Sequence, residues 1–297
     1  MRDILIIKTG AAGDVVRTTT LLSALDGAIT WIIDPKNAPL LPENIPSLQI
    51  IGKAEVGNGD FFDRSFNLVL SLEEDRECAA IASKVQKTKL TGVFLEGDEL
   101  RYTDDAAGWF DMSLVSRRGL EEANRLKIEN EYSFQHWLFK MVGKPFSGEQ
   151  YLIYRNPAIR KNSNLIGIET RSGGTWPNKK WWGYNELVKR LRNDGFDIKI
   201  FTQKNNIRDY LDEIAACSCI ISADSLPMHV ALAYKIPAIA IFNCTPPNEI
   251  YDYGYLTKVV SPVLKENLYD RQLNPQVVNS IDVSVVYNAV KESCVFK

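Results

Sequence analysis

The stretch Asp3-Ile-Leu-Ile-Ile-Lys-Thr-Gly-Ala-Ala-Gly-Asp14 joins a short apolar run to a turn with two glycines and then to a helical pattern. Residues Asp3–Lys8 predict a short buried strand, and Val15–Leu25 predict a helix with apolar positions available to a core. A glycine-containing turn that enters a helix lets the backbone approach a ligand, and the helix N-terminus favours negative charge there. The stretch therefore predicts the first strand, turn and helix of an α/β sheet.

The alternation of strands and helices continues through the first half of the chain and restarts in the second half. Further strands of the first half are predicted at Ile29–Ile33, Leu48–Ile51, Leu68–Leu72 and Leu90–Phe94, with a helix at Glu74–Val85. In the second half the predicted strands are Leu165–Glu169, Asp197–Phe201, Cys219–Ser222 and Pro237–Phe242. The predicted helices of that half are Tyr184–Arg192, Ile207–Ala216, Met228–Tyr234 and Val283–Glu292. We interpret residues 97–148, with a helical pattern at Glu121–Met141, as an insertion that completes the first domain.

Residues 154–164 are polar and contain a proline, which is typical of a linker between domains. We therefore predict an N-terminal domain at residues 1–155 and a C-terminal domain at residues 156–297. Because each half alternates strands and helices, we expect two doubly wound parallel sheets that face each other across a cleft.

Charge and composition narrow the classes of protein to consider. The 35 Lys and Arg residues and 37 Asp and Glu residues give a net charge of −2, which argues against nucleic acid as a partner. The apolar runs are too short for a membrane span, and the N-terminal sequence lacks the pattern of a secretory leader. We therefore expect a cytoplasmic protein in which all five cysteines are reduced thiols: Cys78, Cys217, Cys219, Cys244 and Cys294. Two close cysteines and only two histidines make a poor zinc set, so we expect no metal.

Three segments carry residues suited to chemistry, and each follows a predicted strand. Ligands of an open α/β sheet bind at the carboxyl ends of its strands. The first segment is Lys8–Asp14, in which Asp14 lies in the first turn of a helix. Its carboxylate could cap that helix or act as a general base, and its position leaves both roles open.

The second segment, Thr170–Trp182, combines glycines and hydroxyls with the cations Arg171, Lys179 and Lys180. Such a loop suits a diphosphate, because its cations can neutralise a leaving phosphate. The alternative is a solvated basic loop with one tryptophan packed under the following helix.

The third segment is Ser222–Leu232. Asp224 or Ser225 is predicted to cap a helix that has Pro227 in its first turn, and the exposed amides of that turn form a second anion site. His229 lies one turn into the helix, where a lone histidine is more often a structural residue that bonds a neighbouring loop than a catalyst.

Five stretches form an ordered set along the chain: Lys8–Leu21, Trp31–Pro35, Lys179–Trp181, Asp224–His229 and Phe242–Pro247. The set resembles glycosyltransferase family 9, the ADP-heptose:lipopolysaccharide heptosyltransferase family, where a Gly-Asp pair begins the first helix. The Asp-Ser-x-Pro-Met-His element is its most specific member. The order of the stretches is stronger evidence than any one of them.

The resemblance implies a GT-B fold, with an acceptor held by the first domain and a nucleotide-sugar donor held mainly by the second. Asp14 would deprotonate the acceptor hydroxyl, and the phosphate or acceptor loop would include Gly10, Gly13 and Arg17. The donor nucleotide would be bound by Thr170, Arg171, Lys179 or Lys180, Asp224, Ser225, Met228 and His229.

These roles predict an inverting, metal-independent glycosyltransferase without a cofactor. Its partners would be a nucleotide sugar, by default ADP-heptose, and a glycan or glycolipid acceptor such as a lipopolysaccharide core. A peripheral contact with the inner membrane surface stays open.

Two other functions fit parts of the same pattern. A GT-B-type sugar-nucleotide epimerase would need more than one ionisable group near the sugar, and Asp14 is the only one that we place on the side of the first domain. A non-catalytic nucleotide-sugar-binding protein would keep Lys179 and Asp224 but tolerate the loss of Asp14. Leu226 stands where the family commonly has glycine, and residues 98–119 have no counterpart that we can align, so the sugar and the acceptor stay open.

Overall fold

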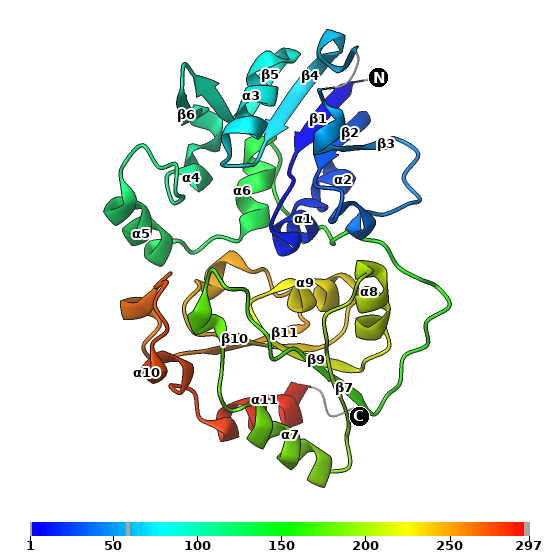
Figure 1. The fold of residues 1–297 in the computed structure, drawn as a ribbon, viewed down its shortest axis with the longest axis vertical. Coiled ribbons are helices and arrows are strands. Elements are labelled where there is room, and N and C mark those ends of the chain that lie inside the picture. The colour runs from blue at the N-terminus through cyan, green and yellow to red at the C-terminus, as the bar shows by residue number, and fades with distance from the viewer. Residues whose placement is uncertain (1, 58–59, 294–297) are drawn as a thin grey trace. The chain divides into compact units, whose positions relative to one another are not determined.

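Two separate β-sheets, one in each half of the chain, contain the strands that the structure describes (Figure 1). The structure is a computed structural model that describes residues 2–57 and 60–293. The chain divides into two units, Met1–Tyr154 and Arg155–Lys297. The acceptor and donor roles expected of the two halves stay predictions.

The first unit contains a six-stranded sheet with the order β3-β2-β1-β4-β5-β6. Its strands are β1 (Asp3–Ile7), β2 (Ala28–Ile33), β3 (Leu48–Gly52), β4 (Ser65–Ser71), β5 (Gln86–Glu96) and β6 (Glu99–Tyr102). The first five are parallel, and β6 runs antiparallel to β5. Because the strand order reverses between β1 and β4, the sheet is doubly wound.

The helices of the first unit are α1 (Ala12–Thr18), α2 (Leu21–Ala24), α3 (Arg76–Lys84), α4 (Ala107–Phe110), α5 (Leu120–Glu129) and α6 (Phe134–Met141). On one face of the sheet, Leu5 and Ile7 of β1 pack with Ile81 of α3 in a buried cluster. Ile6, which points to the other face, is also fully buried. A strand that is covered on both faces is expected to be apolar, as the buried residues Ile4–Ile7 of β1 are.

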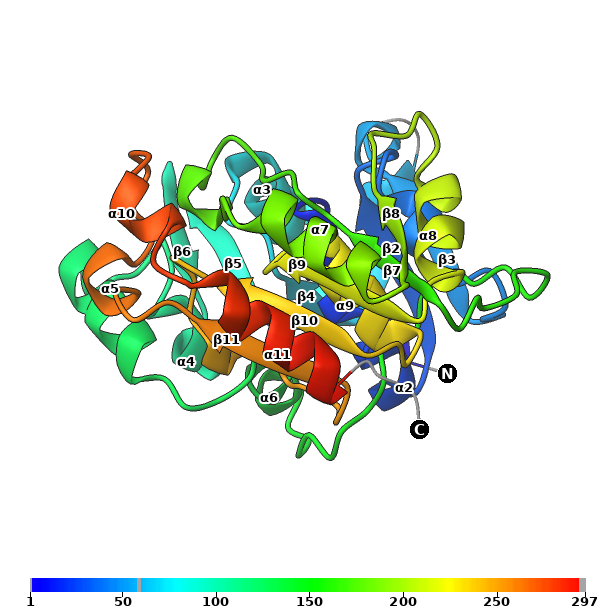
Figure 2. The same ribbon diagram turned by 90° about the horizontal axis from the view of Figure 1, so that it is seen from below.

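The second unit contains a five-stranded, wholly parallel sheet with the order β11-β10-β9-β7-β8. Its strands are β7 (Leu165–Ile168), β8 (Asp197–Ile200), β9 (Cys219–Ala223), β10 (Ala238–Phe242) and β11 (Leu256–Val260). Its helices are α7 (Tyr184–Asn193), α8 (Ile207–Ala215), α9 (Leu226–Ala233), α10 (Pro275–Val278) and α11 (Val283–Ser293). Figures 1 and 2 show α7 and α11 on one face of this sheet and α8 and α9 on the other. The predicted α/β fold of two doubly wound sheets is confirmed.

The prediction of one continuous helix at Val15–Leu25 is wrong, because the structure has two helices there, α1 and α2. Three threonines stand at the break, and their hydroxyls bond to backbone carbonyls three or four residues earlier: Thr18 to Asp14, Thr19 to Val16 and Thr20 to Arg17. Such back-bonding competes with a regular helix.

The single helix predicted at Glu121–Met141 is also two helices, α5 and α6. Between them the Asn130 side chain donates to the Tyr132 carbonyl at 2.7 Å. The Ser133 hydroxyl accepts from the His136 N–H at 3.2 Å and caps the new helix. The polar cap and turn residues therefore override the apolar spacing.

The sequence pattern also missed the strands β6 and β11, which lie at the edges of their sheets. Both are short and carry charged side chains, such as Arg101 and Lys258. Charged residues are common on edge strands and hide the apolar pattern of a strand. No helix among the described residues combines the length and the apolar character needed to cross a bilayer.

Two glycines of the first unit make a matched test of backbone crowding. Gly92 has φ +110°, and a Cβ there would lie 2.0 Å from the Ser71 carbonyl oxygen, whereas Gly97 has φ +59° and nothing within 4 Å. We expect Gly97→Ala to lower the free energy of unfolding by about 1 kcal/mol through strain alone. Gly92→Ala, which adds a clash with backbone, should cost about 3 kcal/mol. Denaturant titration of both variants measures this, and equal losses would contradict the role given to the Ser71 carbonyl.

Candidate functional site

The first candidate site is the turn that leaves β1 in the first unit. Ala11 has a positive φ of 45° and is the N-cap of α1. The N–H groups of Asp14 and Val15 donate to the Ala11 carbonyl at 2.8 and 3.0 Å, which fixes the first turn of the helix. Gly10 lies in the turn, and Gly13 lies inside α1. The turn thus places the Asp14 carboxylate just beyond the carboxyl end of β1.

The Asp14 carboxylate contacts two cations. Arg17 Nη2 donates to Asp14 Oδ1 at 2.5 Å, and Lys8 Nζ lies 3.9 Å from Oδ2. The Arg17 side chain is buried, with its guanidinium 4.3 Å above the Phe134 ring. The N-cap position of α1 belongs to Ala11 and makes no side-chain cap bond. The geometry therefore favours a charge-paired Asp14, one third exposed, over a helix cap.

Glu73 is a residue of this site that the sequence reasoning missed. It follows β4, and its Oε1 accepts from the N–H groups of Thr9 and Gly10 at 2.7 and 2.6 Å. Lys8 Nζ lies 3.1 Å from the same oxygen. The signal in the sequence was its position directly after a predicted strand. Glu73 is therefore a second carboxylate at this turn, besides Asp14.

The neighbouring Glu74 is a second missed carboxylate. Burial raises the pKa of Glu74 above its usual range, although the Ser113 hydroxyl and the charges of Lys127 and Lys8 act in the opposite direction. A carboxylate with a raised pKa beside a candidate site is a feature that active sites share with structural networks.

In the second unit, Lys179 and Asp224 meet at the carboxyl ends of β7 and β9. Lys179 Nζ donates to the Asp224 carbonyl at 2.7 Å and to its Oδ2 at 3.1 Å. Both side chains are largely buried, with 19% and 15% exposed. Two of the three predicted segments thus contribute one ion pair.

Asn178, which the sequence reasoning also missed, holds Lys179 in place. Its side chain is fully buried. Its amide nitrogen donates to the Gln272 carbonyl at 2.8 Å, and its oxygen accepts from the Asn274 N–H at 2.7 Å. The Asn178 side chain therefore ties the lysine loop to the segment that precedes α10.

Arg171 is bound to a carboxylate within its own loop. Its Nε and Nη2 donate to Glu169 at 2.9 and 2.7 Å, and the buried Glu169 also accepts from the Tyr210 hydroxyl at 2.8 Å. Hydrogen bonding to Glu169 raises the pKa of the Arg171 guanidinium. Lys179 is paired in the same way with Asp224, so charge pairing leaves both cations as candidate phosphate ligands.

The helix α9 begins directly after Asp224. Ser225 is its N-cap without a side-chain cap bond, and Pro227 lies in its first turn. Met228 and His229 are buried, and His229 Nε2 lies 3.9 Å from Asp224 Oδ1. The structure thus brings His229 beside Asp224, as the predicted site requires.

The remaining predicted residues of the second unit belong to the loop that carries Lys179. Thr170 is half-buried, whereas Lys180 is exposed and its carbonyl accepts from the Asn243 side chain at 2.7 Å. Trp181 is buried, with its Nε1 donating to the Ile281 carbonyl at 2.9 Å, and Trp182 is half-exposed. A packed tryptophan and an inward-turned lysine therefore occur in the same loop.

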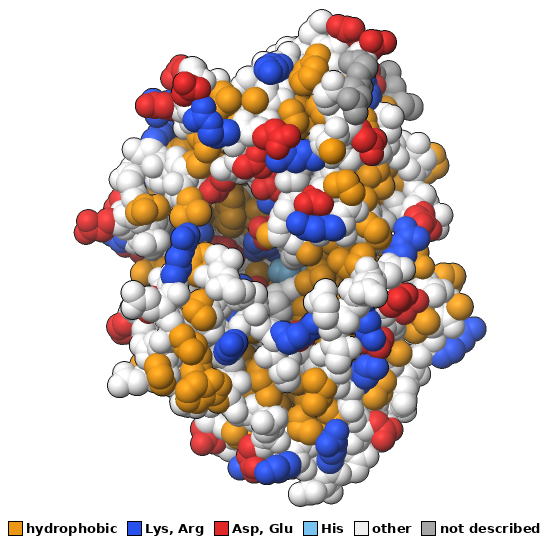
Figure 3. Space-filling view, in the orientation of Figure 1, with side chains coloured by type: hydrophobic (Ala, Val, Ile, Leu, Met, Phe, Trp, Pro, Cys, Tyr) orange, Lys and Arg blue, Asp and Glu red, His pale blue; other side chains and the backbone are white. Residues whose placement is uncertain are grey.

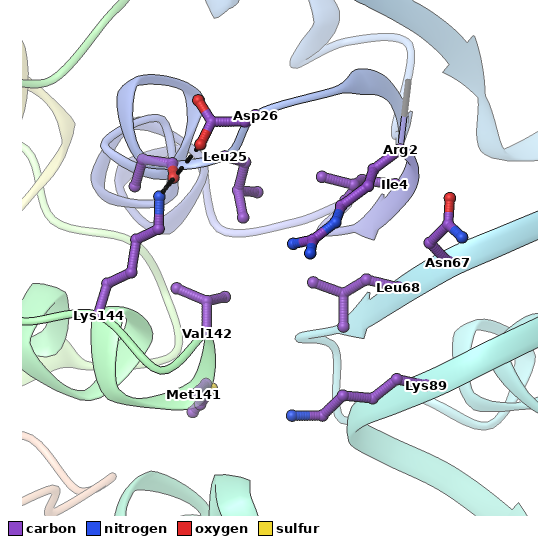
Figure 4. A pocket seen from close by; sticks show the side chains of 11 residues that line it. Arg2, Ile4, Leu25, Asp26, Asn67, Leu68, Lys89, Met141, Val142 and Lys144 are labelled. Atoms are coloured by element: carbon purple, nitrogen blue, oxygen red, sulfur yellow. Dashed lines mark hydrogen bonds and ion pairs between the residues drawn. The ribbon is translucent and has the colours of Figure 1, made fainter.

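A pocket of about 250 Å³ lies elsewhere in the first unit, at the amino ends of β1, β4 and β5 (Figure 4). Its cations include Lys144, which lies 3.6 Å from Asp26, and Lys89, which lies 2.9 Å from Asp105. Since the pocket is at the opposite edge of the sheet from Asp14, we do not place the chemistry there. Figure 3 likewise shows basic and acidic side chains interspersed over one face of the molecule.

The cysteines correct one expectation. Cys78, Cys217 and Cys244 are free and buried, and burial raises their pKa to about 12, 12 and 11. Cys219 is disulfide-bonded, so the prediction of five reduced thiols is wrong, and Cys294 lies outside the described residues. Within residues 2–57 and 60–293, no three His, Cys, Asp or Glu side chains come together as a metal site.

The raised pKa of Glu74 predicts a pH dependence of stability. Below the usual carboxyl pKa, Glu74 is protonated in the folded and in the unfolded protein, so its ionisation does not affect the free energy of unfolding. As the pH rises through the pKa of Glu74 in the folded protein, the fold must bury a charged carboxylate, which lowers the free energy of unfolding. Glu74→Gln, which mimics the protonated form, should therefore gain stability relative to the unchanged protein as the pH rises from about 4 to 8. Denaturant titrations across this range measure the difference. A difference that is constant or falls with pH would contradict the sign.

Comparison with known proteins adds to this geometry. The family model of glycosyltransferase family 9 (heptosyltransferase) matches residues 202–272, which include Asp224 and His229. Two curated relatives, both lipooligosaccharide heptosyltransferase 2 of Campylobacter jejuni subsp. jejuni, are 36% and 34% identical over 147 residues. The match covers 40% of this chain and only 45% and 44% of the relatives.

Solved structures share the fold over almost the whole chain. A family 9 glycosyl transferase from Veillonella parvula has a TM-score of 0.65 at 16% identity, covering 99% of this chain and 97% of its own. E. coli heptosyltransferase WaaC with ADP-2-deoxy-2-fluoro heptose has a TM-score of 0.62 at 14% identity, covering 98% and 99%. E. coli ADP-heptose lps heptosyltransferase II has a TM-score of 0.60 at 15% identity, covering 98% of each chain. The family model and the curated relatives confirm, over part of the chain, the resemblance to glycosyltransferase family 9 that the sequence predicted, and the solved structures share the fold.

Proposed function

We propose that the chain is an inverting glycosyltransferase that moves a heptosyl group from ADP-heptose to a hydroxyl of a lipooligosaccharide or lipopolysaccharide core. The names of the curated relatives support the reaction, and a solved structure that holds an ADP-heptose analogue supports the donor. The observation that carries the proposal is the ion pair between Lys179 and Asp224. It joins the basic loop to the segment matched by the family model, at the edge of the sheet where ligands bind.

The donor diphosphate fits the surroundings of Lys179. An ammonium group has three N–H donors, and Lys179 directs two of them to Asp224, so one is left for a phosphate oxygen. The first-turn amides of α9 receive no side-chain cap and favour an anion. Asp224, whose charge Lys179 offsets, is suited to accept hydrogen bonds from the ribose hydroxyls.

The acceptor hydroxyl would lose its proton to Asp14. A general base must be ionised, and the cations Lys8 and Arg17 favour that form of the carboxylate. In the proposed step, the hydroxyl oxygen bonds to the anomeric carbon as the bond from that carbon to the diphosphate breaks. Attack from the face opposite the leaving group inverts the configuration, and the proton passes to Asp14.

The leaving diphosphate gains negative charge in this step. In the proposal, Lys179 and the amides at the start of α9 stabilise that charge, as preorganised dipoles and cations do in active sites. These groups can supply the stabilisation without a divalent ion, so the proposal includes no metal or cofactor. The acceptor, the cytoplasmic setting and contact with the inner membrane surface stay predictions.

Asp14→Asn tests the base. We expect turnover of ADP-heptose with a deacylated core acceptor to fall by about 10²–10⁴-fold, because the variant cannot accept the proton. The affinity for ADP, measured by calorimetry, should stay within about twofold. Asp26→Asn is the matched control, since Asp26 is exposed and belongs to the same unit. A non-catalytic binding protein would be indifferent to both changes, and an equal loss of turnover and ADP affinity would reject Asp14 as the base.

Lys179→Met and Lys180→Met separate the two adjacent lysines. We expect Lys179→Met to weaken ADP binding about tenfold or more, since charge-assisted contacts are the strong ones. Lys180 is exposed, and its replacement should change the affinity by less than about threefold. Asp224→Asn in the Lys179→Met background shows whether the loss comes only from an unpaired Asp224. Equal effects of the two single variants, or full recovery in the double variant, would overturn the phosphate assignment.

A further inference from the structure

One carboxylate oxygen, Glu73 Oε1, gathers four donors from the turn that leads to Asp14. The Thr9 and Gly10 N–H groups donate to it at 2.7 and 2.6 Å, and the Thr9 hydroxyl donates at 3.2 Å. Lys8 Nζ completes the set at 3.1 Å. Glu73 comes from the end of β4, the strand beside β1, so it links two neighbouring strands where their carboxyl ends meet.

The residues bonded by Glu73 directly precede the turn that carries Asp14, the proposed base. The residue after Gly10 is Ala11, whose strained backbone begins α1 and whose carbonyl accepts from the Asp14 N–H. The Trp31 and Asn37 side chains hold the carbonyls of Lys8 and Thr9, at 2.9 Å each. Among the described residues, Glu73 is the side chain that holds the amides of the turn.

Glu73 also competes with Asp14 for the ammonium group of Lys8. Lys8 Nζ lies 3.1 Å from Glu73 but 3.9 Å from Asp14. Its closer partner is therefore Glu73, and Arg17 is the closer partner of Asp14. The Glu73 and Lys8 side chains are both largely buried, at 14% and 8% exposed, which makes these contacts well defined.

We propose that Glu73 is a positioning residue for Asp14: by holding the Thr9–Gly10 amides and Lys8, it sets where the base stands when the acceptor hydroxyl arrives. The inference rests on the proposed function and deepens it. A misplacement of about 1 Å can lower a rate by about 10²-fold, so the effect of Glu73 should appear in turnover rather than in donor binding.

Two conservative variants separate the effect of the length of the Glu73 side chain from the effect of its charge. Glu73→Gln keeps the length and an oxygen that can accept from Thr9 and Gly10, whereas Glu73→Asp keeps the charge but is one methylene too short. We expect turnover with ADP-heptose and a deacylated core acceptor to fall about 10–100-fold in Glu73→Asp. Glu73→Gln should stay within about threefold of the unchanged protein, and ADP affinity should stay within about twofold in both. Glu99→Gln, at an exposed position of the same unit, is the control.

The same variants in the Asp14→Asn background test whether Glu73 acts through Asp14. We expect Glu73→Asp to lower the residual turnover there by less than about twofold, because the group that it positions is gone. Hydrogen exchange over residues 9–14 gives a readout without activity: it should accelerate in Glu73→Asp and not in Glu73→Gln.

Each other outcome rejects the inference. An equal loss in both backgrounds would make Glu73 a merely structural residue. A loss in Glu73→Gln as large as in Glu73→Asp would reject the role given to the Thr9 and Gly10 amide bonds, which Glu73→Gln keeps. Unchanged exchange in Glu73→Asp would also overturn it. Failure of the proposed function has a different signature, because Asp14→Asn alone would then keep its turnover.

Discussion

Both candidate sites depend on the reversal of strand order inside each parallel sheet, between β1 and β4 and between β7 and β9. Connections between parallel strands are right-handed, so the chain leaves two such neighbouring strands toward opposite faces of the sheet. The loops that follow the two strands therefore diverge, and this leaves a space at the carboxyl ends of the strands that side chains from both loops can enter. In the first unit this places Glu73 beside the turn after β1. In the second it places Asp224 beside Lys179, although 45 residues separate them in the sequence.

At the carboxyl ends of these strands in each sheet, the charged side chains of the candidate sites form ion pairs. Lys8 pairs with Glu73, Arg17 with Asp14, Lys179 with Asp224, and Arg171 with Glu169. Removing a charge from water without a partner costs several kcal/mol, so charges at a partly buried edge are found with partners. The pairing also fixes directions, because each partner limits where the other can point. A site of this kind is preorganised: its dipoles and charges need little rearrangement when a reactant charge develops.

The sequence predicted those features that are local. Strand β10 and residues Ile4–Ile7 of β1 are apolar because both faces are covered, and the fold class follows from the alternation of strands with helices. The segments that follow β1, β7 and β9 were predicted as sites because a strand end is visible in the sequence. The break at Asn130–Ser133 was missed because an apolar spacing over Glu121–Met141 hides a helix cap. The edge strand β11 was missed because its charged residues obscure the strand pattern.

The two sites also differ in how far apart their residues lie in the chain. Asp224 precedes the N-cap of α9 and His229 lies in its first turns, so six consecutive residues specify their arrangement, and a sequence motif can represent it. The arrangement around Asp14 needs Glu73, which is 63 residues from Gly10 in the chain and has no fixed spacing to it that a short pattern would show. The family model matches residues 202–272 and so includes Asp224 and His229 but not Lys179, which is 45 residues from Asp224. A motif can describe a site only where the residues are neighbours in the chain; in the first unit the sheet, by bringing β1 and β4 together, supplies information that the motif lacks.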